Sequence, residues 1–265
     1  MTALAPSLPT PRLVRAELLK LRKRRSLSVT VAALTVGGTV VTYAILALLH
    51  VANPAHHGPA GGVTNLSHVI WLLSALGGGA AVLAGTTAGA GDLGAGVFRE
   101  LVVTGRSRIA LFLARIPGGL AFLLSGVALA YTVAAVASVA FAGSLASPST
   151  GSLVAGGLWV LLSTSVYFLL ALGLSSLVGS RTTTVVILLA WRFALMPIIL
   201  SLTFLGGARD AFPDAGIQQL APHAFADNLQ VGRLSMSAAA SALVLVAWTA
   251  AALAIGAWRT ATRDA

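Results

Sequence analysis

Six long apolar stretches divide this chain, and they restrict its fold more than any other feature of the sequence. They run over residues 28–50, 66–90, 111–141, 153–178, 183–205 and 237–258. Each is long enough, at about 20 helical residues, to cross a hydrocarbon core of about 30 Å. The stretches are continuously apolar rather than alternating, which excludes the strands of a membrane barrel. We therefore expect an all-α polytopic membrane protein with six spans in one transmembrane domain.

Composition supports lipid as the solvent of most of the chain. Charged residues make up 9% of the 265 residues, against about 25% in a soluble domain. The first apolar stretch is longer than the 7–15 residues, roughly, of a signal-peptide core, so we expect it to remain as a span. The chain has no cysteine, which excludes disulfides and cysteine-ligated metal.

Lysine and arginine are distributed unequally between the two faces of this topology. Fourteen lie in the two terminal tails, the loop between spans two and three and the turn between spans four and five, whereas the opposite face has only Arg209 and Arg233. The positive-inside rule then puts both termini, with residues 1–27 as a tail, in the cytoplasm. The excess of arginine over lysine fits a GC-rich bacterial genome, so we expect the bacterial cytoplasmic membrane. The net charge of +10 is explained by this topology and does not require nucleic acid.

The basic tail also has the pattern of an interfacial helix. Four apolar residues fall on one side of it, and several arginines lie elsewhere: Leu13, Val14, Leu18 and Leu21, against Arg15, Arg22 and Arg25. Such a helix can lie in the headgroup layer with its cations facing anionic lipid. An alternative interpretation is that the charges only set the topology, and the two interpretations are compatible.

The cytoplasmic loop over residues 91–108 differs from the other turns. It begins with Asp92 and several glycines, continues as a short amphipathic segment, and ends on Arg106, Ser107 and Arg108. In that segment the apolar residues share one face and the charged pair points away: Phe98, Leu101 and Val102, against Arg99 and Glu100. A purely solvated loop would not need these apolar side chains, so the pattern favours a helix that docks against a soluble partner.

The largest loop on the other face covers residues 206–236. Pro213 and Pro222 punctuate it, and Phe225 and Leu229 follow at a spacing of four. This is the pattern of a short amphipathic helix that begins near a proline. We expect one or two helices that lie at the outer membrane surface.

Taken together, the basic leader AELLKLRKRRS, the six spans and the 91–108 loop resemble the membrane subunits of type II ABC exporters, the ABC-2 permease family. In the loop, Asp92 matches the family's acid, although glutamate is more usual there, and Gly96 matches its glycine. Glu100 and Leu101 match the coupling helix, and Arg108 matches the basic residue before span three. The segment over residues 219–229 resembles an "LP…A…L" element before span six. The resemblance covers nearly the whole chain.

The resemblance implies a permease subunit that forms half of an export pathway and pairs with a second permease subunit in a homodimer or heterodimer. Its coupling helix would sit in a groove of a separate ABC ATPase, which binds ATP and Mg. The residues expected to couple the two proteins are Asp92, Phe98, Arg99, Glu100, Leu101, Arg106 and Arg108. Independently, a P-loop needs Gly-x-x-x-x-Gly-Lys-Ser/Thr, and neither lysine of the chain, Lys20 or Lys23, follows a glycine. We therefore expect no cofactor in this chain and ATP hydrolysis in another.

Arg192 lies about midway along span five, where an arginine costs about 2.5–3.5 kcal/mol on insertion scales. It is about ten residues from either end, so it should face the bundle or a wet cavity. No acid lies mid-span, so we expect no ion pair within the chain. An acid of a partner subunit or an anionic substrate remains an alternative. Hydroxyl groups are the candidate partners within the chain: Thr86, Thr87, Ser163 and Ser165.

We assign Arg192, Thr86, Thr87 and Met196 to the translocation pathway, with Pro197 bending span five. Whether Arg192 contacts substrate remains open. The glycines at Gly85 and Gly89 favour close helix approach, either within the subunit or in a dimer.

Other function classes fit less well. A rhomboid-like hydrolase needs a serine framed by glycines and a histidine in a later span, and a zinc protease needs His-Glu-x-x-His; neither pattern is present. His50, His56 and His57 have no accompanying acid or cysteine, so a solvated loop explains them better than a metal site. A secondary transporter or channel is the main alternative, but ion coupling usually leaves acids within spans. Every acid here lies in a loop, a tail or at the end of a span.

Overall fold

The computed structural model describes residues 9–96, 100, 107–228 and 236–263, and the regular structure in these ranges is helical throughout. Six helices are long and apolar enough to cross a membrane. They are Arg25–Ala52 (α2, η1 and α3), Gly62–Gly94 (α4), Arg108–Ala140 (α6), Thr150–Val178 (α7), Arg181–Ser201 (α8, η2 and α9) and Ala238–Thr262 (α11). This confirms the predicted polytopic all-α fold. The ends of the predicted spans are shifted by up to four residues: span two is longer at both ends, span six ends later, and span five ends earlier, at Ser201.

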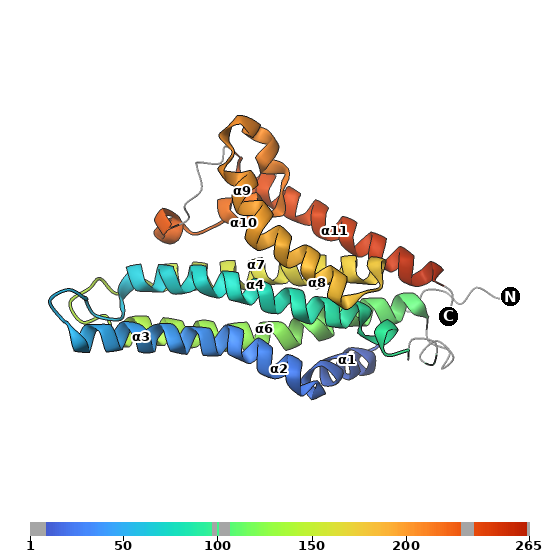
Figure 1. Cartoon of the computed structure of the whole chain (residues 1–265), viewed down its shortest axis with the longest axis horizontal. Helices are drawn as coiled ribbons and strands as arrows, with labels where there is room; N and C mark the ends of the chain where they lie inside the picture. The colour runs from blue at the N-terminus through green and yellow to red at the C-terminus, as the bar shows by residue number, and fades with distance from the viewer. Residues whose placement is uncertain (1–8, 97–99, 101–106, 229–235, 264–265) are drawn as a thin grey trace.

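Four long helices, α3 (Gly38–Ala52, the second half of span one), α4, α6 and α7, lie side by side and form the body of the molecule (Figure 1). α4 is the central helix, packed most extensively on α7 and next on α6. Small residues allow the close approach to α7. A Cβ atom at Gly85 would lie 2.5 Å from the Phe168 carbonyl oxygen, and one at Gly89 would lie 2.6 Å from that of Leu172. The two glycines are therefore used for packing within the subunit.

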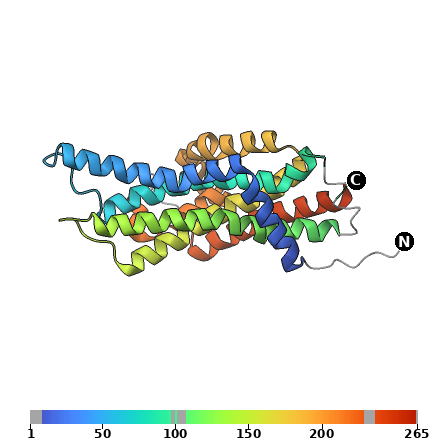
Figure 2. The same cartoon turned by 90° about the horizontal axis from the view of Figure 1, so that it is seen from below.

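The basic tail forms the predicted helix, α1 (Pro11–Lys23), which crosses the bundle obliquely (Figure 2). Pro11 occupies the first turn and the last turn is basic, both favourable at those helix ends. α1 packs on α6, where Gly118 leaves room for the backbone of Val14. Leu21 is fully buried, whereas Arg12 and Arg15 are exposed. The apolar face therefore packs against the protein, while Arg12 and Arg15 point outward.

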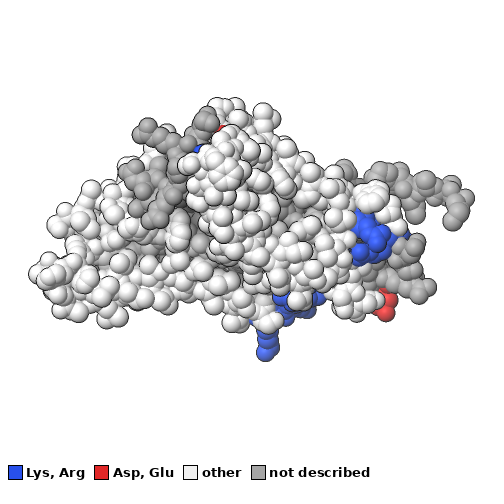
Figure 3. Space-filling model, turned by 45° about the horizontal axis from the view of Figure 1, so that its top comes forward, with Lys and Arg blue, Asp and Glu red and all other residues white. Residues whose placement is uncertain are grey.

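α1 and the end of α11 lie at one end of the bundle (Figure 1), as the even number of spans requires. Lysine and arginine side chains gather toward this end, while most of the visible surface elsewhere is uncharged (Figure 3). We call it the basic end. The turn between α7 and α8 (Arg181–Ala190) also lies here. Gly179 ends α7 in the left-handed conformation, and the Ser180 hydroxyl caps α8.

Span five and α11 diverge from the long bundle, and the chain between them folds back into the gap (Figure 1). This connection contains η3 (Thr203–Ala211), α10 (Pro213–Gln219) and η4 (His223–Asn228). α10 packs on α11, and its residues from Pro213 to Ile217 are buried. The predicted short helices are present, and Leu229 of the expected amphipathic helix lies outside the described residues. α10 is packed into the bundle, because its polar and apolar groups find partners there.

Candidate functional site

Arg192 lies on an irregular turn in the middle of span five. The turn η2 (Trp191–Leu195) is π-helical, and Pro197 follows in the first turn of α9 (Met196–Ser201). Proline has no N–H, and its ring clashes with the carbonyl four residues earlier, so regular α-helical pairing to Phe193 is lost. π turns within α-helices occur frequently at functional sites. The sequence around Pro197 thus accounts for the irregularity that carries Arg192.

Three groups surround the Arg192 guanidinium. Its Nη2 atom donates to the Ser74 carbonyl oxygen of α4 at 2.8 Å, and its Cζ atom lies 3.9 Å from the centre of the Tyr167 ring of α7. Its Nη1 atom lies 3.8 Å from the Oδ1 atom of Asp214 on α10. A Cβ atom at Gly78 would come within 2.7 Å of the guanidinium, so this glycine makes room for it. Span five, α4, α7 and α10 therefore meet at one cation.

The contact with Asp214 corrects the expectation that Arg192 has no acid within the chain. Asp214 follows span five in the sequence, but α10 carries it back into the bundle. Arg192 precedes the end of α9 at Ser201 by nine residues, about 14 Å of helix. The Tyr167 hydroxyl also donates to the Asp214 carboxylate. The hydroxyl groups expected to pair with Arg192 instead donate to carbonyls of their own helices: Thr86, Thr87, Ser163 and Ser165.

Two indole groups fix the segment that carries Asp214. The Trp159 Nε1 atom of α7 donates to the Ile217 carbonyl oxygen at 2.7 Å, and this bond is buried. The Trp248 Nε1 atom of α11 donates to the Ala211 carbonyl oxygen at 2.8 Å, in a more exposed place. The returning segment is therefore bonded on both sides and forms part of the bundle.

A cavity of about 870 Å³ lies beside this cluster. Ligand sites in proteins commonly measure about 300–1,000 Å³. Its walls come from spans one, two, four and five and from α10, and they are mainly apolar and aromatic. The lining residues include Trp71, Leu72, Ala75, Trp159, Phe193, Met196, Leu200 and Ile217, with Thr42, His68, Ser74, Ser201, Gln218 and the Arg192–Asp214 pair as polar members.

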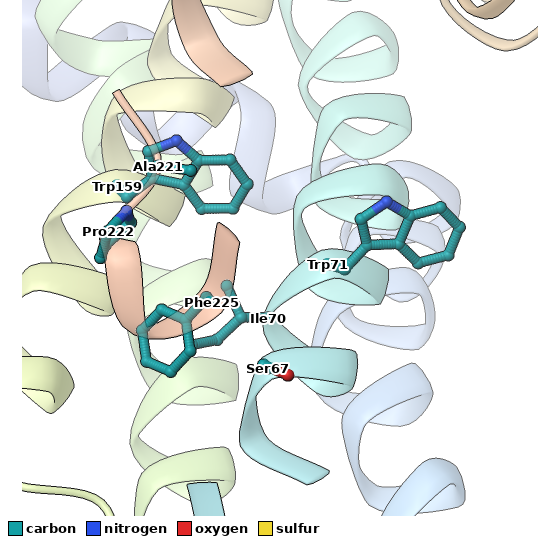
Figure 4. A pocket seen from close by; sticks show the side chains of 7 residues that line it. All are labelled: Ser67, Ile70, Trp71, Trp159, Ala221, Pro222 and Phe225. Atoms are coloured by element: carbon teal, nitrogen blue, oxygen red, sulfur yellow. The ribbon is translucent and has the colours of Figure 1, made fainter. Parts of the chain in front are cut away.

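A smaller pocket adjoins the cavity, with Trp71 and Trp159 in the walls of both. Figure 4 shows Phe225 of η4 and Ile70 of α4 pointing toward one another, with Trp71 pointing away. Gly156 of α7 provides the space: a Cβ atom there would lie 2.9 Å from both the Phe225 ring and Ile70. Phe225 is 4% exposed, so η4 is anchored between α4 and α7.

The residues predicted for a translocation pathway fall into two groups. Arg192 and Met196 line the cavity. Thr86 and Thr87 do not line it: they are buried nearer the basic end of α4, with hydroxyl groups bonded to carbonyls of Val82 and Leu83. Among the described residues, no group of three or more His, Asp and Glu side chains could hold a metal ion.

A second cluster of charges lies at the basic end, centred on Asp92. The Arg115 Nη2 atom of α6 lies 2.9 Å from the Asp92 carboxylate, and its Nη1 atom donates to the Gly89 carbonyl oxygen at 3.1 Å. The Lys20 Nζ atom of α1 lies 3.0 Å from the same carboxylate and also pairs with Glu17. Arg115 is 2% exposed and Asp92 is 3% exposed. α1, α4 and α6 are therefore tied together at the point where the 91–108 loop leaves α4.

Most of the residues expected to couple to an ATPase lie outside the described part of the chain: Phe98, Arg99, Leu101 and Arg106. Glu100 is exposed. Asp92 is buried, so its carboxylate contacts the protein itself and not the solvent. Arg108 begins α6 and donates to the carbonyl oxygens of Ala261, at 3.2 Å, and Arg263. It thereby joins α6 to the end of α11.

Sequence reasoning missed three members of the Arg192 cluster: Ser74, Tyr167 and Asp214. Ser74 contributes only a backbone carbonyl, which no side-chain pattern reports. A usable signal for Asp214 was present, because Pro-Asp after span five begins a helix with an acid in its first turn. Comparison with known proteins adds no relative here: no protein-family model matches the chain, and no curated protein matches it.

Proposed function

We propose that this chain is the membrane permease subunit of an ATP-driven ABC exporter. It would form half of an efflux pathway, with a second permease subunit forming the other half. ATP and Mg would bind to a separate ATPase subunit. The basic end would face the cytoplasm of a bacterium, as the positive-inside rule requires of the more basic face.

The observation that carries this proposal is the buried Asp92–Arg115–Lys20 network at the base of the 91–108 loop. A motor acting from outside the chain needs a rigid connection to the spans. The network provides one, since it links the end of α4 to α6 through a buried ion pair and to α1 through the partly exposed Lys20. Asp92 then acts as a positioning residue behind the docking surface, and exposed Glu100 belongs to the surface itself.

Co-purification tests the proposal. The chain is expressed with the product of a neighbouring ATPase gene, and the recovery of the ATPase is compared between the wild type and Glu100→Arg. We expect the wild type to retain the ATPase and Glu100→Arg to lose most of it. Asp210→Arg, which reverses an acid in the connection beyond span five, serves as the matched control. No associated ATPase, or an equal recovery with Glu100→Arg, would contradict the proposal.

Asp214 gives a reason to keep a second candidate, a secondary transporter not driven by ATP. Ion coupling usually requires an acid within the spans, and Asp214 lies beside Arg192 in the middle of span five. Its pairing with a fixed cation favours a structural role, because a coupling acid must exchange its ion. Transport by the purified chain in proteoliposomes, driven by a proton or sodium gradient without ATPase or ATP, would favour this candidate instead.

A further inference from the structure

The cavity beside Arg192 has two kinds of wall. Trp71, Trp159 and Phe193 provide aromatic surface, and Leu72, Met196, Leu200 and Ile217 provide aliphatic surface. Trp71 of span two is 53% exposed and Phe193 of span five is 51% exposed, so the cavity wall continues onto the outer surface of the chain. Such a wall suits a ligand with an apolar body.

The charges in the wall cancel. Of the described residues that line the cavity, Arg192 and Asp214 form a pair of opposite formal charge. An ionised group is costly in an apolar site unless an opposite charge compensates it. A cationic ligand would lie near the like charge of Arg192, and the Asp214 carboxylate that could compensate it is already paired. An anionic ligand would lie near the like charge of Asp214, and the Arg192 guanidinium is already paired. The wall therefore favours a ligand without net charge.

The wall also holds polar atoms that have no partner among the described residues. Three belong to residues that line the cavity: the Oδ2 atom of Asp214, the Oε1 atom of Gln218 and the Nε atom of Arg192. Asp214 is 7% exposed, and a buried acceptor without a donor is unfavourable by about 1–3 kcal/mol. The Asp214 and Gln218 atoms accept hydrogen bonds, and the Arg192 Nε atom donates one. A hydroxyl or amide group, which both donates and accepts, would complement these atoms.

We propose that this cavity is a binding site for an uncharged amphiphile whose polar end donates hydrogen bonds toward Asp214 and Gln218. Its apolar body lies against Trp71, Trp159 and Phe193. This inference rests on the proposed function in one respect only: it names the ligand as the cargo of the exporter. Binding itself requires no ATPase, so the test below fails or succeeds independently of co-purification.

Tryptophan fluorescence provides the test, because Trp71 and Trp159 are part of the wall. The full chain is placed in phosphatidylcholine nanodiscs. Four quenchers share a twelve-carbon chain with a terminal bromine and differ at the other end: an alcohol, its methyl ether, a carboxylate and a trimethylammonium group. Quenching is compared at equal concentrations of membrane-bound probe. We expect saturable quenching by the alcohol at a concentration at least about tenfold below that for either ion, with the methyl ether intermediate.

Two variants locate the quenching. Ala75→Phe places a ring in the cavity and should remove the saturable component, whereas Ala128→Phe makes the same change on the exposed face of α6 and should retain it. The double variant Trp71→Phe/Trp159→Phe should leave only unsaturable quenching of the other tryptophans. If Ala75→Phe does not fold, this double variant shows whether the saturable quenching comes from the cavity. Equal or tighter saturation by an ionic probe overturns the proposal. So does the absence of saturation, or saturation that survives loss of both tryptophans.

Discussion

The carboxylate of Asp214 lies 3.8 Å from the guanidinium of Arg192, although α9 and η3 separate the two residues in the chain. Both side chains are about nine-tenths buried. Forming a buried pair is costly because both charges lose water, but removing one partner costs more, because it leaves a single buried charge. The pair therefore holds α10 against span five, and its strength can be measured by breaking it.

Neutralising one partner should destabilise the protein more than removing both. We expect Asp214→Asn or Arg192→Met alone to lower the free energy of unfolding by about 3–5 kcal/mol. The double variant Asp214→Leu/Arg192→Met should lose much less, since no unpaired charge remains. Unfolding in mixed micelles with increasing SDS, followed by circular dichroism, measures the three values.

Glu100→Gln is the matched control, because it neutralises an exposed acid at the basic end and should change stability by less than about 0.5 kcal/mol. If the double variant lowers the free energy of unfolding by the sum of the two single changes, the residues act independently. Their pairing then does not explain the loss of stability in the single variants.

The cluster around Asp92 should show a gradient set by burial. Arg115→Met removes the fully buried partner and is expected to cost about 3–5 kcal/mol. Lys20→Met removes a partner whose side chain is 27% exposed, and it should cost only about 1 kcal/mol or less. The same unfolding assay compares them. Equal effects would mean that water screens both contacts alike, contrary to the observed burial.

Much of the fold was predictable, because long apolar stretches leave a chain few alternatives in a bilayer. The six spans and the helix from Pro11 to Lys23 follow from local pattern alone. Local pattern cannot report which helices meet. The burial of α10 depends on contacts of Trp159 and Tyr167, which lie about 50 residues earlier, with Ile217 and Asp214.

The candidate site was predictable only in part for the same reason. Arg192 stands out because a mid-span charge is rare, and Met196 lies one turn away on the same helix. Thr86 and Thr87 looked equally suitable as polar groups within a span. Their hydroxyl groups, however, donate hydrogen bonds to carbonyl oxygens of their own helix, as threonine commonly can. Only the packing separates these cases.

The two indole bonds to the returning segment should differ in strength. Trp159→Phe leaves the buried Ile217 carbonyl without its donor and is expected to cost about 1–3 kcal/mol. Trp248→Phe removes a similar bond in an exposed place and should cost about 0.5 kcal/mol, the lower end for a hydrogen bond. Hydrogen exchange of the α10 amides measures the effect locally. Faster exchange in Trp248→Phe than in Trp159→Phe would contradict this order.

Gly85 provides the sharpest test of helix packing, because the same helix contains a matched glycine without a close neighbour. A Cβ atom at Gly85 would lie 2.5 Å from the Phe168 carbonyl oxygen and 3.1 Å from the Leu172 nitrogen, so α4 and α7 must separate. We expect Gly85→Ala to cost about 1–3 kcal/mol. Gly79→Ala meets nothing within 4 Å and should be neutral or stabilising by up to about 1 kcal/mol, as alanine favours helix more than glycine does. If Gly85→Ala instead changes the oligomeric state and leaves unfolding of the monomer unaltered, the glycine serves a contact between subunits and not the packing of α4 on α7.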